Sequence, residues 1–370
     1  MVVTTKIRLF ILFACFSGLA LLVTYTVQAA GFVQNEAEYW NRGNLPLPTN
    51  GDGSIEHCTV ESNNLKAPNN VVGFNVYTPP SYNSSSQSYP VIYILHGILG
   101  HEYNYFSYFT NSTFFNSSSG SLPGYIDNGL ADEAIIVFVN GGALSFYQDW
   151  ENDTTFGQEY NYGPSSSFPL MSKSVIIEDV IPFIDANFRT IANRSGRAIE
   201  GFSMGGGGAI KLAFQHSDMF CSTIAYSGGT YEEYTGQNNG NPYTGPLVDQ
   251  ASVIATNYAS SILANGLRIR MVDGDGAAGQ GGGSADLSVL LTNLGIPYEY
   301  EPDQPGVINH DYAQYHQATG LYGLNFHFQC FADARSAAPT SVILGSANNF
   351  NFLPLVLKPG STTPGAGSCD

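Results

Sequence analysis

Basic residues are scarce in this sequence: 13 Lys and Arg stand against 30 Asp and Glu, for a formal net charge of −17. Because an acidic chain gains nothing from neutralising phosphate groups, nucleic acid and anionic membrane surfaces are poor partners. Fixed-period repeats and paired Cys-x-x-Cys spacings are lacking too, which argues against a repeat architecture and a zinc site. With 43% hydrophobic and only 12% charged residues, the chain can bury one large core or two ordinary ones and is not intrinsically disordered.

The apolar run near the N-terminus is too short to cross a bilayer. It covers the 15 residues 9–23, whereas a spanning helix needs about 20. It follows Lys6 and Arg8 and is followed by the small residues Ala29 and Ala30, an order typical of a secretory signal peptide rather than an uncleaved anchor. We therefore expect a signal peptide over residues 1–29 and a secreted, extracellular protein.

Cysteine and asparagine usage agrees with secretion. Cys15 leaves with the leader, and an even number of cysteines remains, which predicts two disulfides in an oxidising compartment: Cys58, Cys221, Cys330 and Cys369. Asn-x-Ser/Thr sequons predict a glycoprotein, and there are five of them: Asn83, Asn111, Asn116, Asn152 and Asn193.

Short apolar runs alternate with segments of helical period, the pattern of an α/β domain with a mostly parallel sheet flanked by helices. We expect strands at residues 55–60, 71–77, 90–95, 135–139, 197–200, 222–226, 267–272 and 298–301. Helices are expected at residues 174–187, 204–216, 249–265, 285–293 and 312–322, the first with a kink at Pro182. The domain is predicted over residues 30–331, followed by a C-terminal tail, 332–370.

A candidate nucleophile lies where a predicted strand gives way to a helix. Gly201-Phe202-Ser203-Met204-Gly205 matches G-x-S-x-G, the turn that exposes a nucleophilic serine at the carboxyl edge of a sheet. A glycine-rich helix start that merely packs would show the same letters, but the strand before and the helix after favour catalysis. The backbone N–H of Met204 is one expected oxyanion donor, and that of Ile98, in the loop after strand 90–95, is the second. We expect His96, at the end of that strand, to shape the loop rather than transfer protons.

The activating base is sought downstream of Ser203, since the order in α/β hydrolases is Ser, then Asp or Glu, then His. His216 lies at the far end of the nucleophile helix, and His316 is one to two turns into the last predicted helix, where packing or solvent exposure is expected. His327 follows that helix at the opposite end of the domain. His310, just before the helix, is the predicted base.

The acid has three candidates after strand 267–272: Asp275, Asp273 and Asp286, in order of preference. Asp275 lies beyond the strand end, Asp273 is nearly within the strand, and Asp286 starts the following helix. Residues 274–279 also spell G-x-G-x-x-G, but glycines stand where a phosphate-binding helix should begin, and an EF-hand calcium loop lacks its ligands. We therefore expect no cofactor and no metal.

Three motifs together resemble the esterase D-like family, which includes secreted feruloyl and acetylxylan esterases and mycolyltransferases: residues 89–97, 200–206 and 310–315. The resemblance implies an α/β-hydrolase fold, with Ser203 as nucleophile, His310 as base, and Ile98 and Met204 as oxyanion donors. Two departures stand out. The family's G-x-x-D is Gly274-Asp275-Gly276-Ala277 here, and tyrosines replace the tryptophan after the histidine.

The sequence thus predicts a secreted serine esterase that forms an acyl-enzyme on Ser203, with acyl or feruloyl esters of polysaccharide as substrates. An acyltransferase on the same fold and a non-catalytic binding protein are the alternatives. Loop aromatics either line a substrate pocket or fill the core: Tyr103, Tyr105, Trp150, Tyr231 and Tyr234.

Overall fold

The computed structural model describes residues 40–43, 47, 53–67, 70–98, 100–104, 122–143, 145–150, 170–228, 250–274, 284–336 and 365–370. All of them belong to one compact unit. The predicted signal peptide lies outside these residues, and the division into leader, catalytic domain and tail stays a prediction. No helix within the described ranges combines the length and the apolar character needed to cross a membrane.

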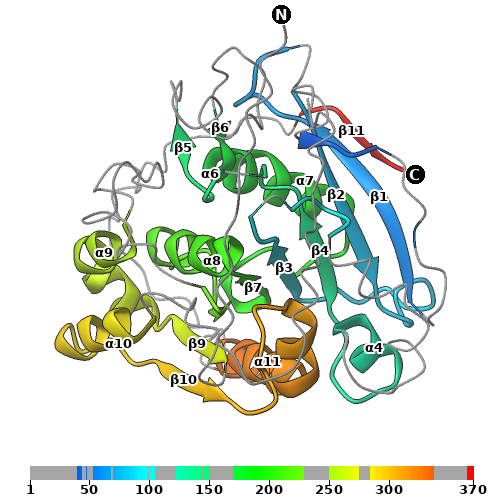
Figure 1. Ribbon diagram of the computed structural model, residues 1–370. Helices are drawn as coiled ribbons and strands as arrows, with labels where there is room; N and C mark the ends of the chain where they lie inside the picture. The colour runs from blue at the N-terminus through cyan, green and yellow to red at the C-terminus, as the bar shows by residue number, and fades with distance from the viewer. Residues whose placement is uncertain are drawn as a thin grey trace, which may run out of the picture. The chain divides into compact units, whose positions relative to one another are not determined.

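A nine-stranded mixed sheet forms the centre, in the order β10-β9-β8-β7-β3-β4-β2-β1-β11 (Figure 1). The six strands from β10 to β4 run parallel, and β2, β1 and β11 add antiparallel pairs at one edge. The mostly parallel sheet is therefore confirmed. The strands are β1 (Ser54–Glu61), β2 (Val71–Thr78), β3 (Val91–Leu95), β4 (Ile135–Val139), β7 (Arg197–Phe202), β8 (Ser222–Tyr226), β9 (Arg268–Gly274), β10 (Glu299–Gln304) and β11 (Gly367–Cys369). Two short strands, β5 (Asp149–Trp150) and β6 (Leu170–Met171), pair separately.

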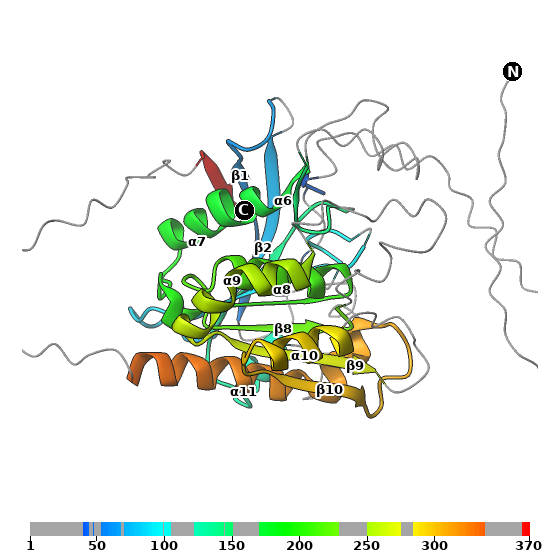
Figure 2. The same cartoon turned by 90° about the vertical axis from the view of Figure 1, so that its left-hand side faces the viewer.

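Helices cover both faces of the sheet (Figure 2). One buried cluster joins the sheet to α7 (Ile181–Asn187), α8 (Met204–Gln215), α9 (Ala251–Asn265) and α10 (Ser284–Asn293). A second cluster joins it to α4 (Leu122–Asp127) and α11 (Tyr312–Ser336). All five residues of β3 and of β4 are buried, as expected for parallel strands covered on both faces.

The helix predicted over 174–187 is present, and its hydrogen-bond pattern changes twice along its length. A short α6 (Ser172–Ser174) leads into a π-helical segment, η1 (Val175–Val180), before α7 begins. Pro182 follows in α7, and Val180 and Ile181 before it are both helical, so the proline lies inside a continuous helix, where its missing N–H removes one helical hydrogen bond. A π-helical segment therefore stands directly before Pro182, and the kink expected at this proline stays a prediction.

The last helix is longer than expected. α11 continues to Ser336 instead of ending at residue 322, so His327 lies inside it and not beyond it. Apolar side chains such as Leu324, Phe328 and Phe331 are buried, and this packing extends the helix past its glycines. Part of the segment predicted as a tail is therefore helical.

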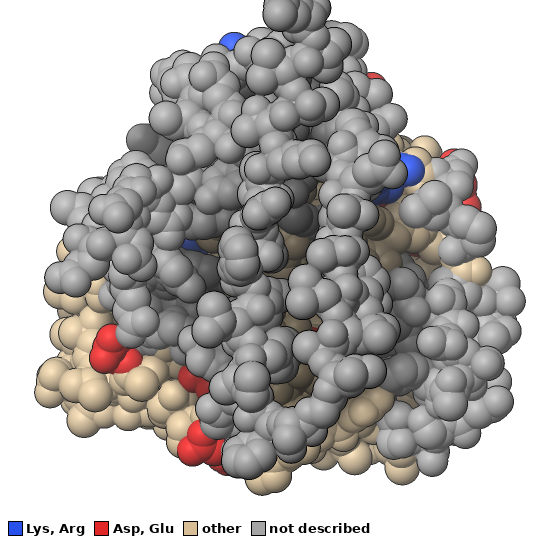
Figure 3. Space-filling model, in the orientation of Figure 1, with Lys and Arg blue, Asp and Glu red and all other residues tan. Residues whose placement is uncertain are grey.

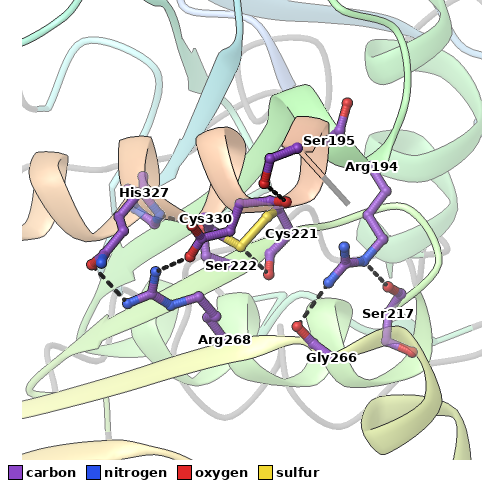
Figure 4. Close-up of a disulfide and its surroundings, with 12 residues drawn as sticks. Arg194, Ser195, Ser217, Cys221, Ser222, Gly266, Arg268, His327 and Cys330 are labelled. Atoms are coloured by element: carbon purple, nitrogen blue, oxygen red, sulfur yellow. Dashed lines mark hydrogen bonds and ion pairs between the residues drawn. A yellow bond between two sulfur atoms is a disulfide. The ribbon is translucent and has the colours of Figure 1, made fainter. Parts of the chain in front are cut away.

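The two expected disulfides are present, and they fasten distant parts of the chain. Cys58 of β1 bonds Cys369 of β11. Cys221 bonds Cys330, which connects the start of β8 to α11 (Figure 4). On the face drawn in Figure 3, the visible acidic residues of the described segments lie in separate small groups.

Candidate active site

Ser203 occupies a sharp turn between β7 and α8. Its backbone has φ 57° and ψ −121°, a sparsely populated conformation that persists only where the surroundings impose it. A Cβ on Gly201 would lie 2.3 Å from the carbonyl oxygen of Gly205, and a Cβ on Gly205 would lie 2.1 Å from that of Leu95. Only glycine permits this close approach of strand and helix, so the G-x-S-x-G pattern has a steric cause here.

The structure brings His310 to this serine across 107 positions of sequence. Its Nε2 lies 2.8 Å from Ser203 Oγ, within hydrogen-bond reach of a nucleophile. The imidazole packs against the ring of Phe202, with ring centroids 4.5 Å apart. His310 belongs to the loop between β10 and α11, as the sequence predicted.

The other imidazole nitrogen contacts a serine that sequence analysis did not single out. His310 Nδ1 lies 2.9 Å from Ser227 Oγ. Ser227 directly follows β8, is 1% exposed and has φ 46°. Since β8 is the parallel neighbour of β7, the carboxyl ends of both strands meet at one edge. A polar residue directly after β8 could therefore have been predicted to lie near the site.

Burial lowers the pKa of His310, while the charge of Asp311 raises it in part. The net lowering keeps the ring neutral around pH 7, the form that can accept a proton. Asp311 also accepts the backbone N–H of Ala313 at 3.0 Å and thereby caps the start of α11. This short side chain therefore fixes the helix end beside the histidine.

Two of the three candidate acids point elsewhere. The carboxylate of Asp273 accepts hydrogen bonds from the hydroxyl groups of Tyr300, at 2.9 Å, and Ser284, at 3.2 Å. Burial raises its pKa to about 6, although those hydrogen bonds oppose the shift. Asp286 is exposed in the first turn of α10. Neither contacts His310 among the described residues, and Asp275 lies outside them.

The two predicted oxyanion donors come from different elements. Met204 is the first residue of α8, so its N–H has no partner within the helix. Ile98 lies in the loop after β3, next to Gly97, where an added Cβ would be 3.5 Å from Ser203 Cβ. In the described part of the chain, no acceptor takes the N–H of Ile98. Met204 therefore directly follows the serine, and Ile98 follows Gly97, which lies against it; their role as oxyanion donors stays a prediction.

The remaining downstream histidines do not reach Ser203. His316 and His327 are buried on α11, and both face Glu200 of β7, with Nε2 to carboxylate distances of 3.5 Å and 3.1 Å. His316 packs in the core, as one of the expected outcomes stated. His216 ends α8, at the far side of the nucleophile helix.

The aromatic residues considered for a pocket are mostly outside the described ranges. Tyr103 is buried, and its hydroxyl donates to the carbonyl of Gly43 at 2.8 Å, so it fills space rather than offering a free surface. Only the backbone of Trp150 is described, in β5. Tyr105, Tyr231 and Tyr234 lie outside. One cluster among the described residues has metal-ligand spacing, Glu56 with Cys58 and Cys369, but its two sulfurs are already joined in a disulfide.

Comparison with known proteins places the chain in context. The Esterase family model matches residues 66–260, more than half of the chain. Esterase Rv1288 of Mycobacterium tuberculosis is 29% identical over 256 residues, which cover 61% of this chain and 50% of that protein. An endo-1,4-beta-xylanase/feruloyl esterase of Xylanibacter ruminicola is 29% identical over 162 residues, 42% of this chain and 19% of that protein. The chain thus spans about half the length of the mycobacterial relative.

Solved structures show the same fold at low sequence identity. A ferulic acid esterase superposes with a TM-score of 0.57 and 21% identity, covering 76% of this chain and all of that one. FphF, a fluorophosphonate-binding serine hydrolase of Staphylococcus aureus, gives a TM-score of 0.54 and 19% identity over 74% of this chain and 98% of its own. The α/β architecture is therefore shared with these hydrolases.

Proposed function

The chain belongs to the Esterase family, and from this premise we propose that it is a secreted serine esterase with an acyl-enzyme mechanism. The observation that carries the proposal is the 2.8 Å contact between Ser203 Oγ and His310 Nε2 at a strained strand-to-helix turn. A serine hydroxyl is a weak nucleophile unless a base accepts its proton, and this contact supplies the base.

In the proposed reaction Ser203 Oγ attacks the ester carbonyl carbon while His310 Nε2 takes the hydroxyl proton. The negative charge that develops on the carbonyl oxygen is stabilised by the N–H groups of Ile98 and Met204. When the tetrahedral intermediate collapses, the ester C–O bond breaks and the histidine returns its proton to the leaving alcohol. Water then repeats these steps on the acyl-enzyme, which releases the acid and the free serine.

For Nε2 to accept a proton, Nδ1 must carry the ring hydrogen and donate it. Ser227 Oγ is the acceptor that the described residues offer. We propose Asp275 as the acid of the triad, since it is the next residue in sequence after Gly274, where β9 ends, and since Asp273 is already engaged by Tyr300 and Ser284. The histidine would then have a carboxylate and a hydroxyl near one nitrogen.

We propose that the substrates are acyl or feruloyl esters of polysaccharide. A relative whose name joins a xylanase to a feruloyl esterase supports this class. Secretion is supported by the apolar leader of the sequence and by two disulfides, which persist in oxidising compartments.

Ser203→Ala tests the function directly. We expect turnover of p-nitrophenyl acetate to fall by at least about 10³-fold, with an unchanged melting temperature. Ser261→Ala, in α9 and away from the site, is the matched control and should keep wild-type turnover. Retained turnover in Ser203→Ala would end the proposal. Comparing acetyl, butyryl and feruloyl esters on the wild-type protein then identifies the acyl group.

A further inference from the structure

The peptide group between Gly97 and Ile98 is held by its carbonyl oxygen. Gly97 O accepts the N–H of Gly100 at 3.0 Å, which closes a tight turn. The same oxygen lies 2.8 Å from Nδ1 of His96, the residue just before it. Two donors from one turn therefore fix the plane of this peptide.

The hydrogen-bond partners of His96 determine which of its nitrogens carries hydrogen. The backbone N–H of Gly141 points at Nε2 over 3.1 Å, so Nε2 must present its lone pair. A neutral imidazole has one N–H, which then resides on Nδ1 and donates to Gly97 O. His96 is 1% exposed, and burial lowers its pKa to about 4, so the ring stays neutral throughout the pH range of ester hydrolysis.

The loop that supplies this N–H is itself anchored. Gly141 O accepts the hydroxyl of Ser172 at 2.6 Å, and the hydroxyl of Tyr147 donates to the backbone oxygen of His96 at 2.9 Å. Phe146, which has φ 49°, accepts a hydrogen bond at 2.8 Å from Lys211 of α8. Hydrogen bonds thus connect His96 to Gly141 and Tyr147, and the neighbouring Phe146 to Lys211 of the nucleophile helix.

The orientation of Gly97 O sets the direction of the next N–H. In a trans peptide the C=O and N–H groups of one plane point in opposite directions. Because Gly97 O faces His96, the N–H of Ile98 faces away from it. Gly97 itself lies against Ser203, and no described residue accepts that N–H.

We propose that His96 is a positioning residue for the oxyanion hole: its Nδ1–H holds the Gly97–Ile98 peptide so that the N–H of Ile98 meets the developing oxyanion. The inference rests on the proposed function and adds a residue to it that never touches substrate. Without the Nδ1 donor the Gly97–Ile98 peptide can rotate. The N–H of Ile98, one of the two oxyanion donors, then points at the oxyanion for only part of the time. Loss of one such donor costs about 10² to 10³ in kcat.

Two substitutions separate the two hydrogen bonds of the ring. His96→Asn places an amide near the position of Nδ1 and keeps a donor for Gly97, but loses the acceptor for Gly141. His96→Gln reaches the position of Nε2 and keeps an acceptor for Gly141, but loses the donor for Gly97. We expect kcat of His96→Gln to fall about 30-fold or more with KM within about twofold of wild type. His96→Asn should stay within about fivefold in kcat.

A purely structural role would make kcat follow the melting temperature, whichever hydrogen bond is lost. Affinity for an arylboronic acid, which forms a tetrahedral adduct on Ser203, supplies a second readout. It should weaken in His96→Gln in parallel with kcat/KM. Unchanged kcat in His96→Gln, or an equal loss in both variants, would overturn the inference.

The wild-type protein provides a test that does not depend on the variants folding. Nitrogen-15 NMR of the imidazole should show hydrogen on Nδ1 and none on Nε2 from pH 5 to pH 8. The opposite tautomer, or a ring protonated at pH 5, would refute the role. Because Ser203→Ala tests the esterase mechanism separately, inactivity of Ser203→Ala together with normal His96 variants would remove this inference alone.

Discussion

His310 hydrogen-bonds Ser203 in the turn after β7, and His327 hydrogen-bonds Ser222 within β8; the two pairs differ in most other respects. Ser203 Oγ lies 2.8 Å from His310 Nε2, and Ser222 Oγ lies 2.7 Å from His327 Nδ1. The second pair also has a carboxylate, since His327 Nε2 is 3.1 Å from Glu200. By connectivity alone, Ser222, His327 and Glu200 are the more complete triad (Figure 4 shows the serine and the histidine).

The buried Ser222–His327 pair is not accessible to a substrate, and among the described residues it has no free N–H groups beside it to bind an oxyanion. Ser222, His327 and Glu200 are all fully buried. Ser222 lies within β8, whose backbone groups belong to the sheet ladder, whereas Ser203 lies beside the first free N–H of a helix. A nucleophile is therefore identified by the strained turn and the unpaired donors around it, and a serine–histidine hydrogen bond by itself is not sufficient.

The largest difference should appear when the two histidines are replaced. We expect His310→Gln to lower kcat/KM by about 10³-fold or more, because the serine loses its base, with little change in stability. His327→Gln should keep kcat per folded molecule and lower the melting temperature instead. Activity assays paired with thermal unfolding check both; an equal loss of kcat in the two variants would contradict the distinction.

Glu200 tests whether the buried Ser222–His327–Glu200 group contributes to stability. Burial raises its pKa, but hydrogen bonds and charges of His316 and His327 outweigh burial and hold the pKa below its usual range. A lowered folded-state pKa means stability that is present above the unfolded value, near 4.5, and that is lost as the pH falls through the folded value. We expect Glu200→Ala to cost about 3 kcal/mol or more in urea unfolding at pH 7, while Glu178→Ala, an exposed control, costs little.

Ser227 tests how much the hydrogen bond at His310 Nδ1 contributes to turnover. When the Ser227 hydroxyl is removed, His310 Nδ1 loses its described hydrogen-bond partner. One hydrogen bond is worth about 1.4 kcal/mol, which corresponds to a factor of about ten, so kcat should fall about tenfold. Ser227→Gly tolerates the positive φ and should behave like Ser227→Ala, which separates the hydroxyl from backbone strain. Ser222→Ala serves as the matched control, and wild-type kcat in both Ser227 variants would remove the role.

The smallest effect is a shift in pH dependence. Since burial lowers the pKa of His310 from 6.5, kcat/KM should rise with pH and reach its plateau with a midpoint below 6.5, as the ring loses its proton. Asp311 raises that pKa, so Asp311→Asn, which still caps α11, should move the midpoint further down. A midpoint in Asp311→Asn above that of wild type would mean that Asp311 lowers the pKa of His310, which would contradict the prediction.

Sequence patterns predicted the elements that carry the site, and they failed where tertiary contacts decide. β3, β4 and β8 are short apolar runs and were found within a residue of their bounds. The extent of α11 depends on packing beyond residue 322, so periodicity did not reveal it. Ser227, at the end of β8, contacts a histidine 83 positions later, and the carboxylate of Asp273 is engaged by Tyr300 and Ser284. Such contacts between distant segments leave no local pattern in the sequence.

We propose that Ser203, and not the more extensively hydrogen-bonded Ser222, is the activated nucleophile. A fluorophosphonate probe forms a covalent bond only with an activated serine, and peptide mass spectrometry of the labelled protein locates the adduct. We expect modification of Ser203 in the wild type, none of Ser222, and no labelling at all in Ser203→Ala. An adduct on Ser222, or a Ser203 that stays unmodified in the folded protein, would contradict it.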